Sequence, residues 1–198
     1  MVGASSDPSR GNGRTLRYLI EGGFAGDLYA INPRRSEVQG LRSWPSIGSI
    51  GQPVDAAIVA LPANAVAGAL RECADARVRS AVVYAGGFAE LGEAGRQAQA
   101  ELTSIAQAAG MLLLGPNSLG AYDARSRSFM TFSSMFEEGF AEGGRIGMVT
   151  QSGGWGSQAR ARPRTAACRS CSGSAPATNP TSMQGKCSTA WRSIRIST

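Results

Sequence analysis

Residues that could bind a phosphate group lie in a glycine-rich stretch at the start of the chain. Residues 3–13 combine glycine, alanine and serine, and a pattern typical of a helix begins within the same stretch. Small residues let the backbone approach a phosphate, and the first turn of a helix supplies unpaired N–H groups and a positive dipole. The spacing differs from G-x-G-x-x-G, so the NAD fingerprint is not met. The stretch predicts a phosphate-binding turn, with an ordinary tight turn as the alternative.

A second candidate stretch, Asn32-Pro33-Arg34-Arg35, follows an apolar run. NAD-binding folds place an Asp or Glu at this strand end, where its carboxylate binds the ribose hydroxyls. A basic pair favours instead an additional phosphate, such as that of NADP or the 3′-phosphate of coenzyme A. The alternative is a solvated basic loop, an interpretation that applies most to Arg35.

Further candidate residues follow later apolar runs. Pro62 stands at the start of a predicted helix, where its missing N–H costs nothing, so a structural role competes with a ligand contact. Gly86 and Gly87 allow the backbone to pass close to a ligand. Asn117 could hydrogen-bond a polar group, and Glu90 could act as an acid or a base.

The composition excludes several classes of function. The chain has no histidine, which excludes histidine bases, histidine metal ligands and phosphohistidine within it. The net charge of +6 lies entirely in residues 161–198, so we expect no nucleic-acid-binding face on the folded part. Because no apolar run is long enough to span a membrane and no signal peptide is evident, we expect a cytoplasmic location. Cys73 lies on an apolar helix face and is predicted to be inert core.

The candidate residues need elements to position them, and the chain alternates short apolar runs with helical patterns. This alternation indicates a parallel sheet built from βα units, and therefore an α/β fold. We predict helices at residues 11–21, 63–76 and 93–109, and strands that end at residue 2 or span 28–31, 56–61, 81–84 and 111–114. Ligands of such sheets bind beyond the carboxyl ends of the strands, which is where the candidate residues fall.

The pattern changes after this predicted sheet. Residues 121–144 show no clear period, and we predict a connector there. Residues 145–150 predict a new strand, which Gln151-Ser152-Gly153 and the start of a helix follow. Residues 161–198 contain no Leu, Val, Phe or Tyr and are predicted to be disordered. The Cys168-x-x-Cys171 pair lies in this tail, but three thiols without a histidine make a zinc or redox site a weak alternative.

The tail also has an unusual coding property. When residues 166 onward are back-translated and moved to another reading frame, a permitted reading restores alternating polarity and acidic residues. We therefore hypothesise a frameshift near residues 162–164. The DNA sequence of this region would decide between a frameshift and an unbroken frame.

Several short motifs occur in a fixed order along the chain. They are Val2-Gly3-Ala4-Ser5, Gly23-Phe24-x-Gly26, Tyr29-x-Ile31-Asn32-Pro33, Pro45-Ser46-Ile47, Val54-Asp55, Pro62-Ala63, Gly86-Gly87-Phe88-Ala89-Glu90, Gly115-Pro116-Asn117-Ser118-Leu119-Gly120 and Gln151-Ser152-Gly153. Each is weak alone, but the set, which runs to about residue 156, resembles the NDP-forming acyl-CoA synthetases, relatives of the succinyl-CoA ligase alpha subunit. The shifted reading of the tail resembles the next segment of that family.

The resemblance implies a Rossmann-like CoA-binding domain at residues 1–122, a connector at 123–144 and the first βα unit of a flavodoxin-like second domain at 145–160. Residues 161–198 would form an off-frame tail. In this family an acyl-CoA, phosphate and NDP are interconverted with a free acid, CoA and NTP, and a phosphohistidine carries the phosphoryl group. The resemblance therefore implies coenzyme A as the ligand.

Roles for single residues also come from the resemblance. By position, the CoA phosphates would lie near Gly3, Ala4, Ser5 and Ser9, and Arg34 stands where the family has a lysine. The pantetheine arm would pass Pro62, Phe88 and Glu90, and its thiol end would lie near Asn117. An anion-binding helix start in the second domain would comprise Gln151, Ser152 and Gly153. No catalytic residue and no metal ligand is assigned.

The chain departs from the family in ways that keep alternatives open. It has no phosphohistidine and no nucleotide-grasp domain, and its first strand is short, so we expect a CoA-binding but catalytically incomplete piece whose grasp subunit or domain lies elsewhere. An NADP-dependent Rossmann oxidoreductase shares the βα pattern and Arg34-Arg35 but would need a G-x-G-x-x-G turn and a Tyr-x-x-x-Lys pair. A non-catalytic module that senses CoA or a nucleotide suits a chain with binding loops and no phosphoryl carrier.

Overall fold

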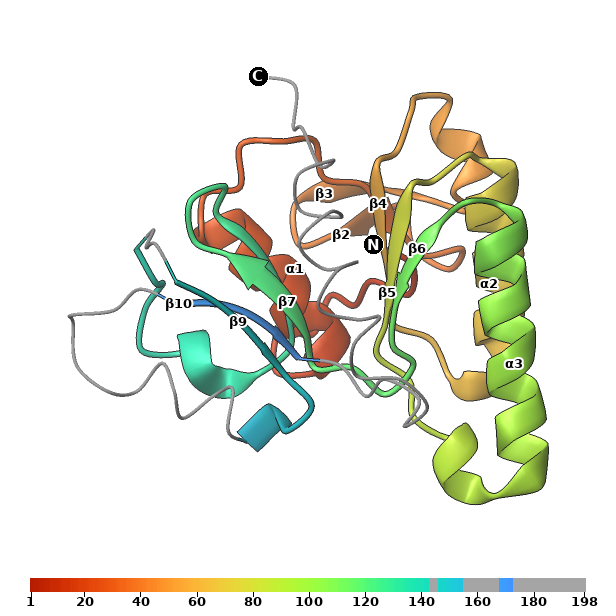
Figure 1. Ribbon diagram of the computed structural model, residues 1–198. Coiled ribbons are helices and arrows are strands. Elements are labelled where there is room, and N and C mark those ends of the chain that lie inside the picture. Colours follow the sequence, from red (N-terminus) through yellow and green to blue (C-terminus); the bar gives the residue numbers. More distant parts are fainter. Residues whose placement is uncertain (143–145, 155–167, 173–198) are drawn as a thin grey trace.

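The central feature of the fold is a parallel sheet with helices on both of its faces (Figure 1). The computed structural model describes residues 1–142, 146–154 and 168–172. One half of the sheet has the order β4-β5-β6, from Ala56–Val59, Ser80–Val83 and Leu112–Leu114. The other half has the order β1-β3-β2. Val2 forms parallel bridges to Ile31 and Val59 and thereby joins the two halves. The predicted α/β, Rossmann-like fold is confirmed.

The half that contains β1 differs from the prediction. β1 is short, Ala30–Ile31, and pairs in parallel with β3, Leu41–Trp44, which the sequence pattern did not predict. β3 in turn pairs antiparallel with β2, Glu37–Val38, across a tight turn with Gly40 at φ +80°. Two-residue strands are too short to show an alternation of polarity, and this is why the pattern missed β2.

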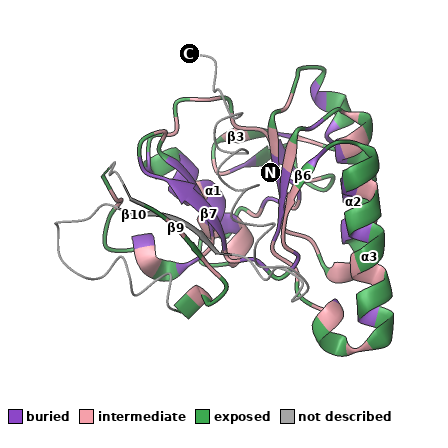
Figure 2. Ribbon diagram, in the orientation of Figure 1, coloured by how far each residue is buried: buried purple, intermediate pink, exposed green. Residues whose placement is uncertain are grey.

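Three helices cover the sheet, and the sequence predicted each of them to within one residue. α1 spans Gly11–Glu21, α2 spans Ala63–Asp75 and α3 spans Glu93–Ala108. Figure 1 shows α2 and α3 side by side along one face of the sheet and α1 on the opposite face. Each helix buries one stripe, and the outer sides of α2 and α3 are exposed (Figure 2). Short 3-10 helices occur at Gly48–Ile50 (η1), Ala89–Leu91 (η2) and Ser134–Phe136 (η3).

Different side chains fill the two faces. The α2/α3 face holds an aliphatic core to which Leu70 of α2 and Leu102 of α3 contribute, and Cys73 is fully buried within it. The α1 face holds a smaller group around Leu16, Ala4 and Ala30. Beyond this group lies an aromatic cluster, which we define as Tyr18, Tyr122, Phe129 and Phe136.

The predicted connector contains regular structure. β7, Gly120–Asp123, and β8, Ser128–Thr131, form an antiparallel hairpin that packs on α1. All four residues of β7 are buried, so the strand lacks the alternation by which a half-exposed strand is recognised (Figure 2). The sequence pattern failed at this point for that reason.

A second sheet has the order β8-β7-β10-β9. β9 spans Ile146–Thr150, as predicted. β10 spans Cys168–Ser172, within the segment predicted to be disordered, and pairs in parallel with β9 and antiparallel with β7. Backbone pairing needs no apolar side chains, which explains how a polar segment can take this place. The remainder of residues 161–198, including the hypothesised frameshift, lies outside the described residues.

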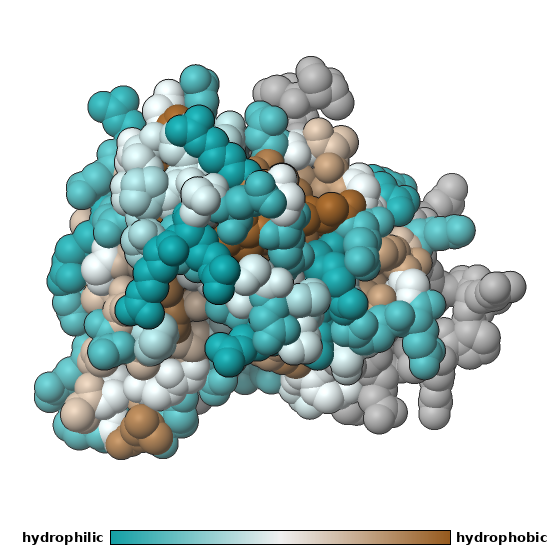
Figure 3. All heavy atoms as spheres, turned by 180° about the vertical axis from the view of Figure 1, so that it is seen from behind, coloured by the Kyte–Doolittle hydropathy of each residue, from teal (hydrophilic) through white to brown (hydrophobic). Residues whose placement is uncertain are grey.

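The surface is mostly hydrophilic, and apolar residues show in only a few places on the face drawn in Figure 3. The large apolar side chains that are exposed include Leu91, at 72%, and Leu112. None of the helices in the described part of the chain is long and apolar enough to cross a bilayer. The same residues contain no group of three or more His, Cys, Asp or Glu side chains that could hold a metal ion.

Candidate functional site at the carboxyl edge of the sheet

The first turn of the chain passes close to the end of β4. Gly3 has φ +81°, and its N–H donates to the carbonyl of Ile31 over 3.0 Å. A Cβ atom at Gly3 would lie 2.6 Å from the carbonyl oxygen of Ala60 and 2.8 Å from a methyl carbon of Leu61. Only glycine fits this close approach at a positive φ. The turn is therefore seated between the ends of β1 and β4.

Three amide side chains hold the carbonyl oxygens of this turn. Asn12 donates to the carbonyl of Gly3 over 2.8 Å, and Asn32 donates to that of Ala4 over 2.9 Å. Gln39 donates to the carbonyl of Ser5 over 2.8 Å and also to that of Gly13 over 2.9 Å. The turn is thereby fixed without a ligand, which lowers the entropy that binding would cost. The sequence patterns identified none of these bracing roles.

The outer part of the turn contains a carboxylate. Ser9 donates to Asp7 from its hydroxyl over 2.6 Å and from its backbone N–H over 3.0 Å, and these two hydrogen bonds lower the pKa of Asp7. Arg10 lies 3.4 Å from the same carboxylate. The side chain of Ser5 accepts the N–H of Asp7 over 3.1 Å. The hydroxyl of Ser9 is thus used within the turn.

Basic residues follow β1, as predicted. The side chain of Asn32 accepts the N–H of Arg34 over 2.9 Å, which fixes the start of this loop. Arg34 and Arg35 are both exposed, and among the described residues no carboxylate lies within ion-pair distance of either. Their charges are available to an anion at this edge of the sheet.

The strands of the other half end in loops that lie close together. Pro62 is exposed and immediately precedes α2, with φ −59°. A Cβ atom at Gly87 would lie 3.3 Å from Ala63, the first residue of that helix. A Cβ atom at Gly86 would lie 3.0 Å from Oε1 of Glu90 and 3.3 Å from Oδ1 of Asn117. The glycines therefore bring Pro62, Glu90 and Asn117 to one place.

Glu90 closes its own loop. Its Oε1 accepts the N–H of Gly87 over 2.6 Å. Partial burial raises the pKa of Glu90, but hydrogen bonds from the backbone N–H groups of Gly87, Glu90 and Phe88 outweigh that effect and lower it. Glu90 is therefore a carboxylate at neutral pH, which fits a role as a hydrogen-bond acceptor better than a role as a general acid.

Asn117 and Phe88 both lie near Glu90, but Asn117 is at the edge of the sheet and Phe88 is in the core. Asn117 has φ +56°, follows the cis peptide bond between Gly115 and Pro116, and donates its N–H to the carbonyl of Ala85 over 2.7 Å. Its backbone is thus held at the carboxyl edge of the sheet. Phe88 is only 2% exposed and belongs to the aliphatic core. Its side chain anchors the loop from inside, whereas the sequence predicted that it lines an open path.

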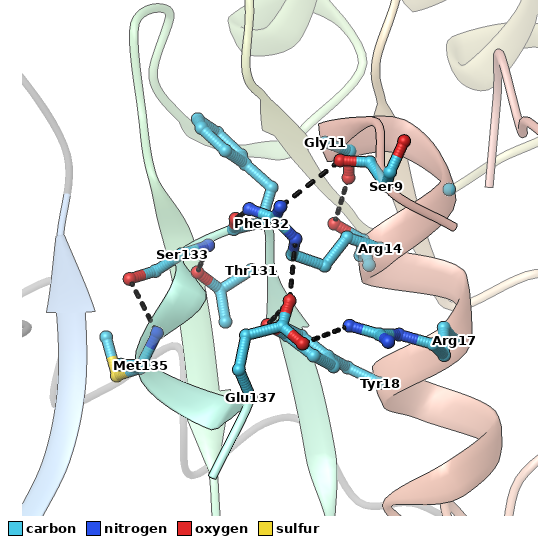
Figure 4. A network of polar contacts seen from close by, with 12 residues as sticks. Ser9, Gly11, Arg14, Arg17, Tyr18, Thr131, Phe132, Ser133, Met135 and Glu137 are labelled. Carbon is cyan, nitrogen blue, oxygen red and sulfur yellow. Dashed lines mark hydrogen bonds and ion pairs between the residues drawn. The ribbon is translucent and has the colours of Figure 1, made fainter. Parts of the chain in front are cut away.

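A network of polar contacts joins the turn to the hairpin (Figure 4). Arg14 donates to the carbonyl of Ser9 and to that of Phe132, each over 3.2 Å. Glu137 lies 3.0 Å from Nε of Arg14 and accepts hydrogen bonds from Arg17 over 2.6 Å and from the hydroxyl of Tyr18 over 3.0 Å. α1 therefore connects the candidate site to residues more than a hundred positions later in the chain.

The aromatic residue that follows β5, Tyr84, is half-buried in the same region. The hydroxyl of Tyr84 lies 3.2 Å from that of Thr15, and its ring contacts Phe132 edge-on at 4.8 Å between centroids. Burial raises the pKa of Tyr84 far above its ordinary value, and the hydrogen bond with Thr15 reduces this effect only partly. Tyr84 is therefore a neutral packing residue.

The predicted anion site after β9 is described only at its start. The hydroxyl of Thr150 accepts the N–H of Ser152 over 3.1 Å, and Gln151 and Ser152 are exposed. A Cβ atom at Gly153 would lie 2.0 Å from a methyl carbon of Leu119, so a larger residue here would require the Leu119 side chain to move. Residues 155–167 lie outside the described part, and an anion-binding helix at this point stays a prediction.

Comparison with known proteins agrees with this arrangement. Residues 1–123 match a protein family described as "CoA binding domain". The chain is 35% identical over 153 residues to ADP-forming acetate–CoA ligase I of Archaeoglobus fulgidus, covering 77% of this chain and 22% of that protein. It is 33% identical over 156 residues to the alpha subunit of ADP-forming acetate–CoA ligase II of Pyrococcus furiosus, covering 79% and 33%.

A solved structure agrees as well. The apo form of acetyl-coenzyme A synthetase 1 of Ca. Korarchaeum cryptofilum superposes with a TM-score of 0.73 at 35% identity, over 81% of this chain and 34% of that one. The chain thus spans about a fifth to a third of the length of the curated relatives that it matches.

Proposed function

The chain belongs to the CoA binding domain family, and its homologues include ADP-forming acetate–CoA ligases. On this basis we propose that the carboxyl edge of its parallel sheet binds coenzyme A, as a substrate or product of an acyl-CoA ligase. The observation that carries the proposal is the Gly3 turn, whose carbonyl oxygens are held by amide side chains. Arg34 and Arg35 follow the neighbouring strand β1 and form no ion pair with any described residue.

The phosphorylated end of CoA fits the half of the edge that belongs to β1. The backbone of Gly3, Ala4 and Ser5 can approach a pyrophosphate, and Arg34 can reach a 3′-phosphate from the end of β1. No carboxylate stands at the end of β1, where an NAD site would have one. Asp7 repels an anion at the outer part of the turn, so the phosphates should lie nearer to Gly3 than to Ser9.

The pantetheine arm fits the other half of the edge. It would run past Pro62 and the glycines at 86 and 87, which carry no side chain of their own. Its amide groups would find an acceptor in the Glu90 carboxylate and a polar side chain in Asn117. The thiol would then lie near Asn117, beyond the end of β6.

Ligase chemistry would need more than this chain. With no histidine in its sequence, the chain offers no phosphohistidine, so a phosphoryl carrier would have to come from elsewhere. We propose that a nucleotide-grasp subunit or domain cooperates with this one, as a separate part that binds the NDP. The division into residues 1–122, 123–144 and 145–160, with 161–198 as an off-frame tail, remains part of the same proposal.

The proposal is tested by isothermal titration calorimetry with three ligands. We expect CoA to bind, 3′-dephospho-CoA to bind about tenfold more weakly because one phosphate contact of about 1.4 kcal/mol is lost, and NADPH not to bind. NADPH has the extra phosphate and the adenosine but no pantetheine, so it separates the two chemistries. Binding of NADPH without CoA would replace this proposal with an oxidoreductase site.

A further inference from the structure

Arg14 of α1 holds the outer part of the Gly3 turn, which we define here as residues 3–9. Near the sheet, three amide side chains hold the carbonyl oxygens of residues 3–5. Farther out, Nη2 of Arg14 donates to the carbonyl of Ser9 over 3.2 Å. The turn is therefore held at two places along its length, and Arg14 supplies the outer one.

The same guanidinium group also holds the end of the hairpin (Figure 4). Its Nη1 donates over 3.2 Å to the carbonyl of Phe132, the residue that follows β8, and its Nε lies 3.0 Å from Oε1 of Glu137. A guanidinium group is planar and presents its donors in a fixed fork, so it meets all of these acceptors in one arrangement. The position of Ser9 is thereby tied to residues more than a hundred positions later in the chain.

Close packing joins the same three parts of the molecule. A Cβ atom at Gly13 of α1 would lie 1.9 Å from the carbonyl oxygen of Asp7 in the turn. A Cβ atom at Gly11, the first residue of α1, would lie 3.3 Å from Cβ of Phe132. Because the Gly3 turn, the start of α1 and the end of β8 are packed so closely, a shift of the hairpin end displaces the other two.

The hold on Ser9 also fixes a carboxylate. Ser9 donates to Asp7 from its hydroxyl over 2.6 Å and from its N–H over 3.0 Å. Asp7 repels an anion, so a phosphate can approach the backbone of residues 3–5 only while this carboxylate stays at the outer part of the turn. Arg10 precedes α1 and forms no side-chain cap, so its side chain does not compete with an anion for the N–H groups at the start of the helix.

The surroundings of Arg14 suit a role through these contacts better than a role as an exposed charge. Its side chain is 26% exposed, and the carboxylate of Glu137 compensates its charge. Arg34 and Arg35, in contrast, are exposed and have no carboxylate within ion-pair distance among the described residues.

We propose that Arg14 is a positioning residue of the CoA site, which holds the Gly3 turn in its binding conformation only while the β7–β8 hairpin is docked on α1. The affinity for CoA therefore depends on contacts from Phe132 and Glu137, which lie outside the turn. This inference rests on the proposed function, because it concerns the same site.

The test compares Arg14 with Arg17, which is a matched control. Arg17 is also on α1, is 28% exposed and donates to Glu137 over 2.6 Å, but it lies about one helical turn farther from the Gly3 turn. Calorimetry with CoA measures Arg14→Ala, Arg14→Lys and Arg17→Ala, on full chains that circular dichroism shows to be folded.

We expect Arg14→Ala to weaken CoA binding about tenfold, because the turn must then be ordered by the ligand. Arg14→Lys should weaken it nearly as much, since an ammonium group keeps the charge but cannot reproduce the planar fork. Arg17→Ala should change the affinity by less than about twofold.

Two further measurements test the link to the hairpin. Glu137→Ala should weaken CoA binding about threefold in the unsubstituted chain and have no effect in Arg14→Ala, because the two residues act as a unit. Without ligand, hydrogen exchange at the amides of Ser9 and Arg10 should quicken about tenfold in Arg14→Ala and stay unchanged in Arg17→Ala.

Several results would overturn the proposal. Full affinity in Arg14→Lys would make Arg14 a simple positive charge, and equal losses in Arg14→Ala and Arg17→Ala would indicate a general loosening of α1. Additive losses from Arg14→Ala and Glu137→Ala would break the link to the hairpin. If the unsubstituted chain does not bind CoA, the proposed function fails and this inference fails with it. An unchanged affinity in Arg14→Ala rejects this inference alone.

Discussion

The two faces of the parallel sheet are built on different principles. On the α2/α3 face, aliphatic side chains from two helices fill a dry core, and sequence periodicity predicts both helices. On the α1 face, Tyr18 of α1 belongs to an aromatic cluster with Tyr122 and Phe129 of a distant hairpin. Glu137, which follows η3, accepts hydrogen bonds from Arg17 and Tyr18 of α1. The first face holds the sheet together, and the second ties the candidate CoA turn to the hairpin.

The largest effect should come from truncating the aromatic cluster. Phe129 is fully buried, so Phe129→Ala should reduce the free energy of unfolding by about 3–5 kcal/mol. Leu70→Ala, on the opposite face, is the matched core truncation and should cost about 2–5 kcal/mol. Urea denaturation followed by far-UV and near-UV circular dichroism measures both.

The shape of the transition decides whether the two faces form one unit. If the hairpin is part of the folded core, both variants unfold in a single transition in which the two signals coincide. If Phe129→Ala loses its near-UV signal at low urea while the far-UV signal of the helices persists, the hairpin unfolds separately. The hairpin would then be an independent connector, and the α1 face would not belong to the same folded unit as the α2/α3 face.

The next effect concerns the Gly3 turn, which lies between the ends of β1 and β4. Gly3 and Gly40 have nearly equal positive φ angles, +81° and +80°, but a Cβ atom collides with Ala60 only at Gly3 and meets nothing within 4 Å at Gly40. Gly40→Ala should cost about 1 kcal/mol from backbone strain. Gly3→Ala should cost roughly 2–4 kcal/mol, because overpacking is added to the strain.

CoA titration of the same pair separates a local from a general effect. Gly3→Ala should weaken CoA binding at a temperature where it is still folded, and Gly40→Ala should not. Equal CoA affinities in the two variants would mean that the turn does not contact the ligand.

A smaller effect is expected at the end of β1. Arg34→Ala should weaken CoA binding about tenfold, the effect of losing about 1.4 kcal/mol of phosphate contact. It should leave the affinity for 3′-dephospho-CoA unchanged, and Arg35→Ala should alter neither affinity. Calorimetry of both variants with both ligands measures this. A loss that is the same for the two ligands would assign Arg34 to another phosphate.

The smallest effect should come from the charged bridge of the α1 face. The hydrogen bond from Arg17 lowers the pKa of Glu137, partial burial opposes this, and Tyr18 and the neighbouring arginine charges add to the lowering. Because the pKa is lower in the folded state, the stability from Glu137 is present at neutral pH and is lost as the pH falls through the folded pKa. Its side chain is 39% exposed, so solvent screening limits the contribution to less than about 1 kcal/mol.

Glu137→Gln should therefore lower the unfolding midpoint slightly at pH 7 and flatten its decline below about pH 4.5. Glu138→Gln is the control, since Glu138 is exposed next to it. Thermal unfolding from pH 3 to pH 7 measures both variants. Identical pH profiles for the two would show that the bridge does not contribute.

The sequence predicted what local periodicity and glycine spacing encode. The three helices and the strands β4, β5, β6 and β9 repeat apolar residues at regular intervals or form continuous apolar runs, and the candidate residues sit where those strands end. The fold class and the edge of the sheet that carries the candidate site followed from this.

What escaped prediction depends on contacts between distant residues. Gln39 supports the turn from 34 positions away, and no local pattern marks it as different from any other surface glutamine. The strand β7 is buried on both sides by partners that only the folded chain brings together. The family resemblance implied that the pantetheine arm passes Phe88, although the side chain of Phe88 turns inward to the core.

The burial of Cys73 would have a chemical consequence if the proposed CoA site receives acyl-CoA thioesters. A nearby thiolate can take the acyl group from a thioester by exchange. This reaction would leave the protein acylated and would remove the acyl group from the thioester. Burial raises the pKa of the Cys73 thiol to about 11, and its side chain is fully enclosed in the aliphatic core. Cys73 is therefore both protonated and out of reach, and it cannot divert an activated acyl group.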